Sequence, residues 1–376
     1  MAVTVRRNYH LDVTATGPDW PTSPGTPITI NSGGTYSGYY KSTDAGTPAV
    51  LIATTAPVVL SGALIEHTGV GIETTFNHLA NLTVRDCKIE QLDPGAGNGE
   101  RAIYSWRAQT LIVEYCDLVD GNGIRWDGGA TTVDVGQIRY NRCFNIGRYG
   151  TGELVQFLQL NQATFPDGCE VAWNHVENTP FLTEVEDVIN CFGTSGASGT
   201  PVDIHHNLID GGFRPPTTGA YGHTGTGTVV GDGVATGGSF FHVHHNTYVR
   251  CLNGGPTAAG GDSVEIDNNV VVYSGLIDGV PSGPDFGNGL VFWDYPVTSG
   301  TPTNGSVHDN VVGYNRLVGG DLERSDYFTP ECGLHGNVCS NNTSMAEPVT
   351  VEDEDAACAD WEAARITAGV TIGPRP

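Results

Sequence analysis

The chain has 376 residues, and 17 Lys and Arg against 42 Asp and Glu give it a formal net charge of −25. A polyanion of this kind lacks the cationic surface that binds nucleic-acid phosphates or anionic membranes, so neither is an expected partner. No apolar run approaches the roughly 18 residues that a membrane-spanning helix needs. Glycine, at 52 residues, is about twice as frequent as usual.

Residues 1–26 precede the repetitive part of the chain. Prolines cluster towards the end of this segment, as is typical of a turn or linker. No apolar stretch follows Arg6 and Arg7, so the pattern is not that of a secretory signal peptide. We therefore expect an attachment or capping segment and synthesis in a cytoplasm. The nine cysteines contain no CxxC pair, and we interpret them as free thiols that mostly pack in the core.

A short phrase recurs through residues 27–345: an apolar residue, two further residues, Asn, one residue and another apolar one. Successive copies lie 23 to 41 residues apart. Apolar residues alternate before the Asn and change phase after it, which predicts a strand, a bend and a second strand. An inward Asn at the bend would satisfy its amide by stacking on the Asn of the next coil. The predicted ladder positions are Ala63, Cys87, Cys116, Asn141, Asn174, Asn207, Asn246, Asn269, Asn310 and Asn337.

This phrase resembles the repeats of right-handed parallel β-helix proteins of the pectate-lyase-like superfamily, over roughly residues 27–342. The resemblance implies an all-β protein, a right-handed parallel β-helix solenoid of about ten or more coils spanning residues 27–345. A β-sandwich is the alternative, but its strands would recur about every 8–12 residues, which is more often than the phrase does.

A further strand in each coil carries polar and aromatic residues that would line one outer face. Strands of neighbouring coils lie about 4.8 Å apart, so these side chains would form a continuous surface. Sugars offer hydroxyls to carboxylates and C–H faces to aromatic rings. We therefore predict a glycan-binding face made by Arg107, Arg125, Trp126, Asp127, Gln159, Asn190, Trp293 and Asp294.

Four residues are candidates for catalysis: Glu186, Asp187, His223 and Asp232. Adjacent carboxyl groups can keep one proton between them, and glycosidic bond cleavage uses such an acid with a second carboxylate. His223 lies in a glycine-rich loop before Asp232 and could act as acid or base. The alternative for each residue is a solvated strand face. The chain contains no match to the Asn-Thr-Asp, Gly-His-Gly and Arg-Ile-Lys motifs of polygalacturonases. No catalytic role is therefore carried over from that family, and the sequence does not decide whether the protein is an enzyme.

Histidines gather in His205-His206 and in His242-x-His244-His245, a pattern that resembles metal ligands. They occupy outward positions just before the ladder Asn, where a stacked row of rings explains them. We therefore predict no metal site and no cofactor, although a lyase reaction would use Asp and Glu side chains to hold Ca²⁺.

Residues 346–376 are predicted to form a C-terminal cap and tail with a short helix. Acidic residues at 352–355 suit the first turns of a helix, and the alanines that follow favour helix. Such a cap would cover the edge that the last coil of a solenoid exposes.

Three functions are compatible with this sequence. The preferred one is a phage tail protein of tailspike-like or minor tail type, located in the virion and made in the host cytoplasm. It would be a homotrimer that contacts other tail proteins and binds, or binds and degrades, host surface polysaccharide. The alternatives are a secreted, extracellular polysaccharide lyase or glycoside hydrolase and a non-enzymatic structural or adhesive solenoid. The net charge favours a neutral glycan over a polyuronate.

Overall fold

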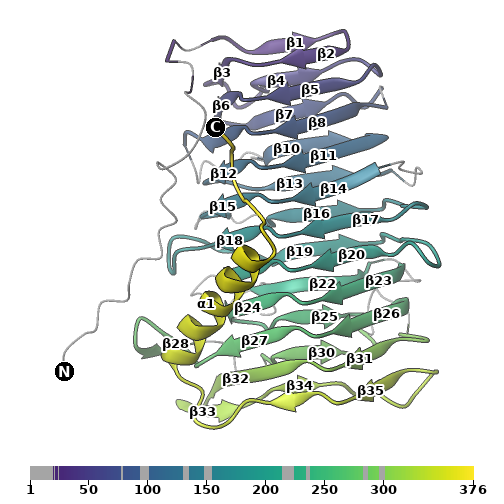
Figure 1. Cartoon of the computed structure of the whole chain (residues 1–376), viewed down its shortest axis with the longest axis vertical. Helices are drawn as coiled ribbons and strands as arrows, with labels where there is room; N and C mark the ends of the chain where they lie inside the picture. Colours follow the sequence, from purple (N-terminus) through teal and green to yellow (C-terminus); the bar gives the residue numbers. More distant parts are fainter. Residues whose placement is uncertain are drawn as a thin grey trace.

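The computed structural model describes residues 20, 22–23, 25–77, 79–93, 101–129, 135–147, 155–213, 224–233, 238–282, 287–295 and 301–376. Three long sheets, A, B and C, run along the molecule, and each coil contributes one strand to each sheet (Figure 1). All strand pairs in these sheets are parallel except β32–β33. The chain is therefore an all-β parallel β-helix, as the sequence predicts.

Sheet A consists of β1 (Ile28–Ile30), β4 (Val50–Ile52), β7 (Val70–Thr74), β10 (Arg101–Trp106), β13 (Ile124–Asp127), β16 (Leu158–Asn161), β19 (Asp187–Phe192), β22 (Thr226–Asp232), β25 (Pro256–Ala258), β30 (Leu290–Phe292) and β34 (Tyr327–Phe328). Sheet B consists of β2 (Gly34–Tyr36), β5 (Val58–Ser61), β8 (Asn81–Arg85), β11 (Thr110–Glu114), β14 (Val135–Arg139), β17 (Cys169–Ala172), β20 (Val202–His205), β23 (Ser239–His244), β26 (Asp262–Asp267), β31 (Ser306–His308) and β35 (Val338–Ser340).

Sheet C consists of β3 (Tyr39–Ser42), β6 (Leu64–His67), β9 (Lys88–Gln91), β12 (Asp117–Val119), β15 (Arg142–Phe144), β18 (His175–Glu177), β21 (Leu208–Gly212), β24 (Thr247–Cys251), β27 (Val270–Tyr273), β32 (Val311–Val318) and β33 (Asp321–Arg324), and β36 (Thr343–Ser344) pairs with β32. A separate hairpin joins β28 (Leu276–Ile277) to β29 (Val280–Pro281).

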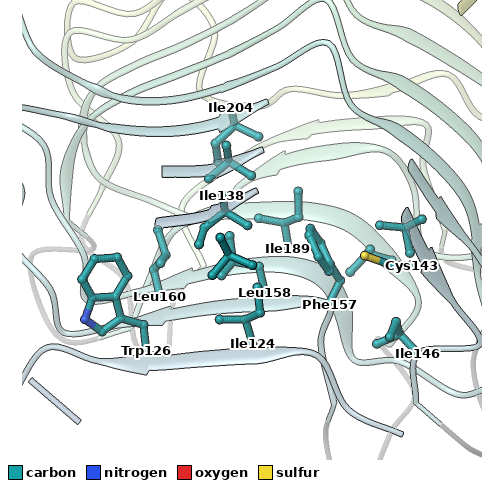
Figure 2. Packing of buried hydrophobic residues seen from close by; sticks show 14 of the residues in the cluster. Ile124, Trp126, Ile138, Cys143, Ile146, Phe157, Leu158, Leu160, Ile189 and Ile204 are labelled. Atoms are coloured by element: carbon teal, nitrogen blue, oxygen red, sulfur yellow. The ribbon is translucent and has the colours of Figure 1, made fainter. Parts of the chain in front are cut away.

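The interior of the solenoid is one continuous apolar cluster that extends from Ile30 to Tyr314. Residues of the same type stack on one another because the strands of successive coils are in register, as Ile138, Val171 and Ile204 do in sheet B. Figure 2 shows this packing in the middle coils, with branched aliphatic side chains beside Phe157 and Trp126. Each coil thus buries its apolar face only by stacking on its neighbours, as in other solenoids.

The bend between sheets B and C contains the predicted asparagine ladder. Each ladder Asn donates its amide to the next ladder Asn and to a main-chain carbonyl of the preceding coil. Asn207, for example, donates to Asn246 Oδ1 at 2.9 Å and to the Val171 carbonyl at 2.8 Å. Its own Oδ1 accepts from the main chain and amide of Asn174. The buried amide is therefore fully satisfied, which explains why Asn is selected there.

The residue just before each ladder position has a left-handed backbone, which produces the bend. Its φ is 53° at both His206 and His245 and 56° at Asp309, where a residue with a Cβ rarely adopts such a value. Cys116, in an earlier coil, occupies the ladder position and its main-chain N–H donates to Asn141 Oδ1 at 2.9 Å. The substitution of Cys for Asn at the N-terminal end of the ladder is thus confirmed.

The last predicted ladder position is wrong. Asn337 accepts from the Gly305 main chain and donates to the Pro302 carbonyl, outside the ladder. Asn342 takes the ladder position, because its Oδ1 accepts from the Asn310 amide. The strand register agrees, since Val307 pairs with Cys339 and not with Leu334. Asn337 directly precedes strand β35 and Asn342 directly precedes strand β36, so their local sequences are alike. Only the register of the coils shows which Asn belongs to the ladder.

The C-terminal helix α1 (Val351–Thr367) is present, but it lies along the flank of the solenoid rather than across its open end (Figure 1). Thr350 and Asp353 form a capping box at its start. Ala357 and Trp361 pack on Leu208, Val249 and Val272 of sheet C. The flank is apolar at these outward positions, which a helix can cover.

Polar contacts fix α1 and the tail that follows it. Trp361 Nε1 donates to the His206 carbonyl at 2.8 Å, and the buried carboxylate of Glu354 accepts from the main chain and hydroxyl of Ser274. After α1 the chain runs back along the solenoid, where the guanidinium of Arg375 pairs with Asp86 at 2.8 Å. Residues 346–376 thus bridge late and early coils. Most of residues 1–26, the predicted attachment segment, lies outside the described residues.

The prediction that all cysteines are free thiols is wrong for one pair, because Cys332 and Cys339 form a disulfide. They lie in the last coil, where the chain turns back on itself within seven residues and brings the two side chains together. The other seven are free, and all of these except Cys358 are buried. Among the described residues, no helix is both long enough and apolar enough to span a membrane.

Candidate functional site on the outer face of sheet A

The middle strands of sheet A place polar side chains in one outward row. Tyr104 of β10 lies opposite Arg125 of β13, which lies opposite Gln159 of β16, and Gln159 lies opposite Asn190 of β19. A second outward row lies two residues further along each strand and contains Trp106, Asp127 and Asn161. Four of the predicted glycan-binding residues are therefore brought together: Arg125, Asp127, Gln159 and Asn190.

Asp127 is the centre of a hydrogen-bonded network at one end of these rows. Its carboxylate accepts from Arg125 Nε at 3.0 Å and from the amide of Asn161. Burial and this carboxylate together raise the pKa of the Tyr104 hydroxyl. The Arg125 guanidinium lies over the Tyr104 ring, with the cation 5.9 Å from the ring centre. Both Tyr104 and Asn161 were missed from the sequence, although they occupy the same alternating positions as Arg125 and Asp127.

An aromatic cluster adjoins this network. The Trp106 ring lies 5.0 Å from Tyr104 and 5.7 Å from Phe76, and Arg107 stands over the Phe76 ring. Phe76 is 58% exposed, which is unusual for a large apolar side chain. Arg107 is thus on the predicted face, but at its edge and against an aromatic ring. Exposed rings beside hydrogen-bonding groups are the combination that sugar recognition uses.

Three carboxyl groups lie at the other end of the rows. The amide of Asn190 donates to Asp187 Oδ2 at 2.9 Å and to Asp232 Oδ2 at 3.3 Å, so one amide joins two acids. The amide of Gln156 donates to Glu186 Oε2 at 2.6 Å. Glu186, Asp187 and Asp232, three of the catalytic candidates, therefore lie in one cluster. Gln156, which orients Glu186, was not among the predicted residues.

Two of these acids, Glu186 and Asp187, retain protons more strongly than ordinary carboxyl groups. Burial, and then the charge of Asp232, raises the pKa of Glu186 to about 7. Burial and the neighbouring Glu186 raise the pKa of Asp187 well above its usual range, against the opposing effect of the Asn190 hydrogen bond. Like charges in a poorly solvated place favour the protonated form of one partner. The cluster therefore offers a proton donor near neutral pH beside further carboxylates.

Two polar atoms in the outward row add acceptors. Within the part of the chain that the structure describes, Gln159 Oε1 and Asn190 Oδ1 are buried without a hydrogen-bond partner. A buried carbonyl oxygen without a donor costs free energy, so such atoms commonly bind water or a ligand hydroxyl. Both belong to the row between the aromatic cluster and the acids.

The remaining predicted residues do not join this site. Trp126 is completely buried and packs edge-on against Phe165, so its prediction as a glycan-binding residue is wrong. It follows Ile124 by two positions and therefore points inward with it (Figure 2). Trp293 and Asp294 follow β30, two strands beyond β22, where Trp293 contacts Phe328 and Asp294 accepts from Thr301. His223 lies outside the described residues.

No family model and no curated protein matches this chain. Among solved structures, the chain is similar to a mannuronic acid specific polysaccharide family 6 lyase enzyme from human gut microbiota. The identity is 11%, the match covers 93% of this chain and 91% of that one, and the TM-score is 0.38. At this level of similarity the function has to be argued from the residues of the site.

Proposed function

We propose that the outer face of sheet A binds a polysaccharide and hydrolyses it, with Glu186 as general acid and Asp232 as the second carboxylate. The observation that carries this proposal is the acid cluster, in which Glu186 has a pKa of about 7 beside Asp187 and Asp232. Glycoside hydrolysis needs a protonated acid and a carboxylate on the same bond. The aromatic cluster and the outward row supply stacking and hydrogen bonds for neighbouring sugar units.

The proposed reaction is balanced by one water molecule. Protonated Glu186 donates its proton to the glycosidic oxygen as the bond to the anomeric carbon breaks. Asp232 either attacks that carbon or takes a proton from the water that attacks it. Asp187 is buried and hydrogen bonded to Asn190, and it acts as a positioning residue that holds the Asn190 amide between Asp187 and Asp232. The products are a new reducing end and a new hydroxyl.

Hydrolysis fits this site better than elimination. A lyase removes a proton next to the carboxylate of a uronate, and it needs positive charge to neutralise that carboxylate. Arg125 is paired with Asp127, and the whole chain carries a net charge of −25. Such a face repels polyuronates, so the proposed substrate is a neutral glycan.

The test is incubation of the full chain with a panel of neutral and uronate-containing polysaccharides. New reducing ends without the absorbance of unsaturated uronates would support hydrolysis. Unsaturated products would replace the proposal with a lyase reaction. Binding without products, unaffected by Asp232→Asn, would leave a carbohydrate-binding solenoid.

A second proposal concerns the place of the protein in a larger assembly. We propose that it is a tail-associated phage protein that functions as a homotrimer on host surface polysaccharide. The last coils leave large apolar side chains exposed, including Phe328 at 40%, Leu334 at 49% and Val338 at 58%. The helix that could have covered them lies on sheet C instead. Sedimentation of the full chain would give three copies if this is correct, and a stable monomer at micromolar concentration would contradict it.

A further inference from the structure

The outer face of sheet B carries alternating carboxylates and imidazoles. Asp203 of β20 lies opposite His242 of β23, and His205 lies opposite His244. The next strand, β26, places Glu265 opposite His242 and Asp267 opposite His244. All of these side chains point away from the core, because the residues between them, such as Val243, are buried. The stacked row of histidine rings that the sequence predicts is therefore accompanied by carboxylates on the neighbouring strands.

Three of these groups converge on one point. His244 Nε2 lies 2.9 Å and His242 Nδ1 3.8 Å from the same oxygen, Asp203 Oδ1. The three donor atoms all lie within 4.8 Å of one another. A fourth donor is adjacent, since His205 Nε2 is 4.0 Å from the other Asp203 oxygen and its ring stacks on His244 at 5.0 Å.

The far nitrogens of the same imidazoles are already engaged. Asp267 Oδ1 lies 2.6 Å from His242 Nε2, and Asp267 itself is buried. A carboxylate at this position accepts the Nε2–H, which leaves Nδ1 as a lone-pair donor towards Asp203. His245 Nδ1 lies 2.8 Å from His244 Nδ1 and orients that ring in the same way. Metal-binding histidines in proteins have this arrangement, in which a carboxylate or other acceptor holds the second nitrogen.

From this geometry we propose that Asp203, His242 and His244 bind one transition-metal dication of the Zn²⁺ class, with His205 or water as the fourth ligand. Zinc–nitrogen and zinc–oxygen bonds are about 2.0–2.2 Å long, so tetrahedral ligand atoms stand roughly 3.4 Å apart. The observed separations of 2.9 and 3.8 Å lie on either side of this value. Two or three imidazoles with one carboxylate select Zn²⁺, Ni²⁺ or Co²⁺ over Ca²⁺ and Mg²⁺, which prefer oxygen ligands.

Binding at this place joins β20 to β23 on a face that the proposed glycan site does not use. The inference is therefore independent of the proposed function. A metal would replace the hydrogen bond between His244 and Asp203 with two stronger bonds to the same atoms, with no change in the core beneath.

The experiment uses the full chain after removal of metals with a chelator. Titration with Co²⁺ should give the visible absorption of a four-coordinate ion that saturates at one equivalent, and Zn²⁺ should displace it. Excess Ca²⁺ should not compete. Binding that never saturates, or that Ca²⁺ abolishes, would overturn the proposal.

Variants distinguish this site from chance binding to surface histidines. Asp203→Asn and His244→Gln should each weaken Co²⁺ binding by more than tenfold. Asp267→Asn should weaken it by about 10- to 100-fold, although that residue touches only the far side of His242. The matched control is His335→Gln, because His335 is exposed in the last coil and should leave affinity unchanged. Circular dichroism of the metal-free variants checks that they are folded. Equal affinity in the parent and in Asp203→Asn would mean that histidines alone bind the ion, and would refute the site.

Discussion

The outer faces of sheets A and B both carry rows of partly buried carboxylates, yet these acids have opposite protonation behaviour. On sheet A, burial and the charge of Asp232 raise the pKa of Glu186 to about 7. On sheet B, the hydrogen bond from His205 and the nearby Arg139 lower the pKa of Glu170 in spite of its burial. Both sheets consist of parallel strands stacked coil on coil, although β19 and β22 of sheet A have a register shift between Asn190 and Phe192.

The difference comes from the partner of each acid. Glu186 accepts from the neutral amide of Gln156, which cannot compensate a negative charge, whereas Glu170 pairs with Arg139 at 2.8 Å. Neutral partners leave a buried acid protonated and reactive, while cationic partners hold it ionised. Proton transfer is therefore expected on sheet A, and ion pairing or metal binding on sheet B.

The largest expected effect is on catalysis. Glu186→Gln removes the proposed general acid, so cleavage of a neutral polysaccharide should fall by about 10²- to 10⁴-fold. Glu170→Gln is the matched control on sheet B, and its rate should equal that of the parent. Initial rates of reducing-end release measure both. A similar loss of rate in the two variants would show that proton donation is not confined to the acids of sheet A.

The pH dependence of cleavage gives the next test. Because Glu186 must be protonated and its pKa is about 7, the rate should fall by about tenfold per pH unit well above pH 7. The corresponding limb should be missing from the residual rate of Glu186→Gln. A parent rate that stays constant from pH 7 to 9 would remove Glu186 from the acid role.

Sheet C extends the comparison to an imidazole whose charged neighbours are cationic. Burial, and then Arg142 and Arg365, lowers the pKa of His175 to about 3. Below about pH 6.5 the imidazole of His175 takes up a proton in the unfolded chain but stays neutral in the folded protein. The contribution of His175 to the free energy of unfolding is therefore present above about pH 6.5 and is lost as pH falls below it. Acidification to pH 5 should therefore destabilise the protein, by about 2 kcal/mol from this residue alone.

The measurement for His175 is urea unfolding at pH 7 and pH 5, followed through Trp361, whose ring lies 5.5 Å from His175. His175→Gln should reduce the difference between the two pH values. His335→Gln serves as an exposed control that should leave it unchanged. If His175→Gln had the same acid sensitivity as the parent, another group would be responsible.

The smallest expected effect is on stability at the two contrasted faces. Asp267→Asn weakens the hydrogen bond with His242 and should cost about 1 kcal/mol at pH 6. The pKa of His242 is raised: burial lowers it, but Asp267 and the other acids outweigh that effect. Its stabilisation is therefore complete below pH 6.5 and is lost as pH rises through the folded pKa, so the cost should shrink by pH 8.

Glu186→Gln should change with pH in the same direction but go further, because at pH 8 it should no longer cost any stability. The pKa of Glu186 is raised, so its contribution is complete below the unfolded pKa and is lost as pH rises through about 7. At pH 8 the variant should be as stable as the parent or more so, because it removes a buried charge. Thermal melting of both variants at pH 6 and 8 makes the comparison, and a Glu186→Gln variant that melts below the parent at pH 8 would contradict it.

Much of the fold could be predicted from the sequence because each coil repeats the same local requirement. Alternation of apolar residues defines the buried faces, and a buried Asn at a bend must find amide partners in the neighbouring coil. The replacement of Asn by Cys87 and Cys116 followed from the same spacing. Alternation also indicates that Trp126 points inward with Ile124, and it is a better guide here than the general preference of sugars for aromatic rings.

Only the tertiary structure decided which outward residues meet. Within the asparagine ladder, hydrogen bonds between neighbouring coils join residues 23 to 44 positions apart, and the lengths of the insertions between them vary. The register therefore had to be known before Asn342 could replace Asn337 in the ladder, or before Asp203 could be seen beside His242 and His244. Protonation follows the same logic, because the pKa of a carboxyl group depends on burial and on partners from other coils, and neither is a property of its own segment.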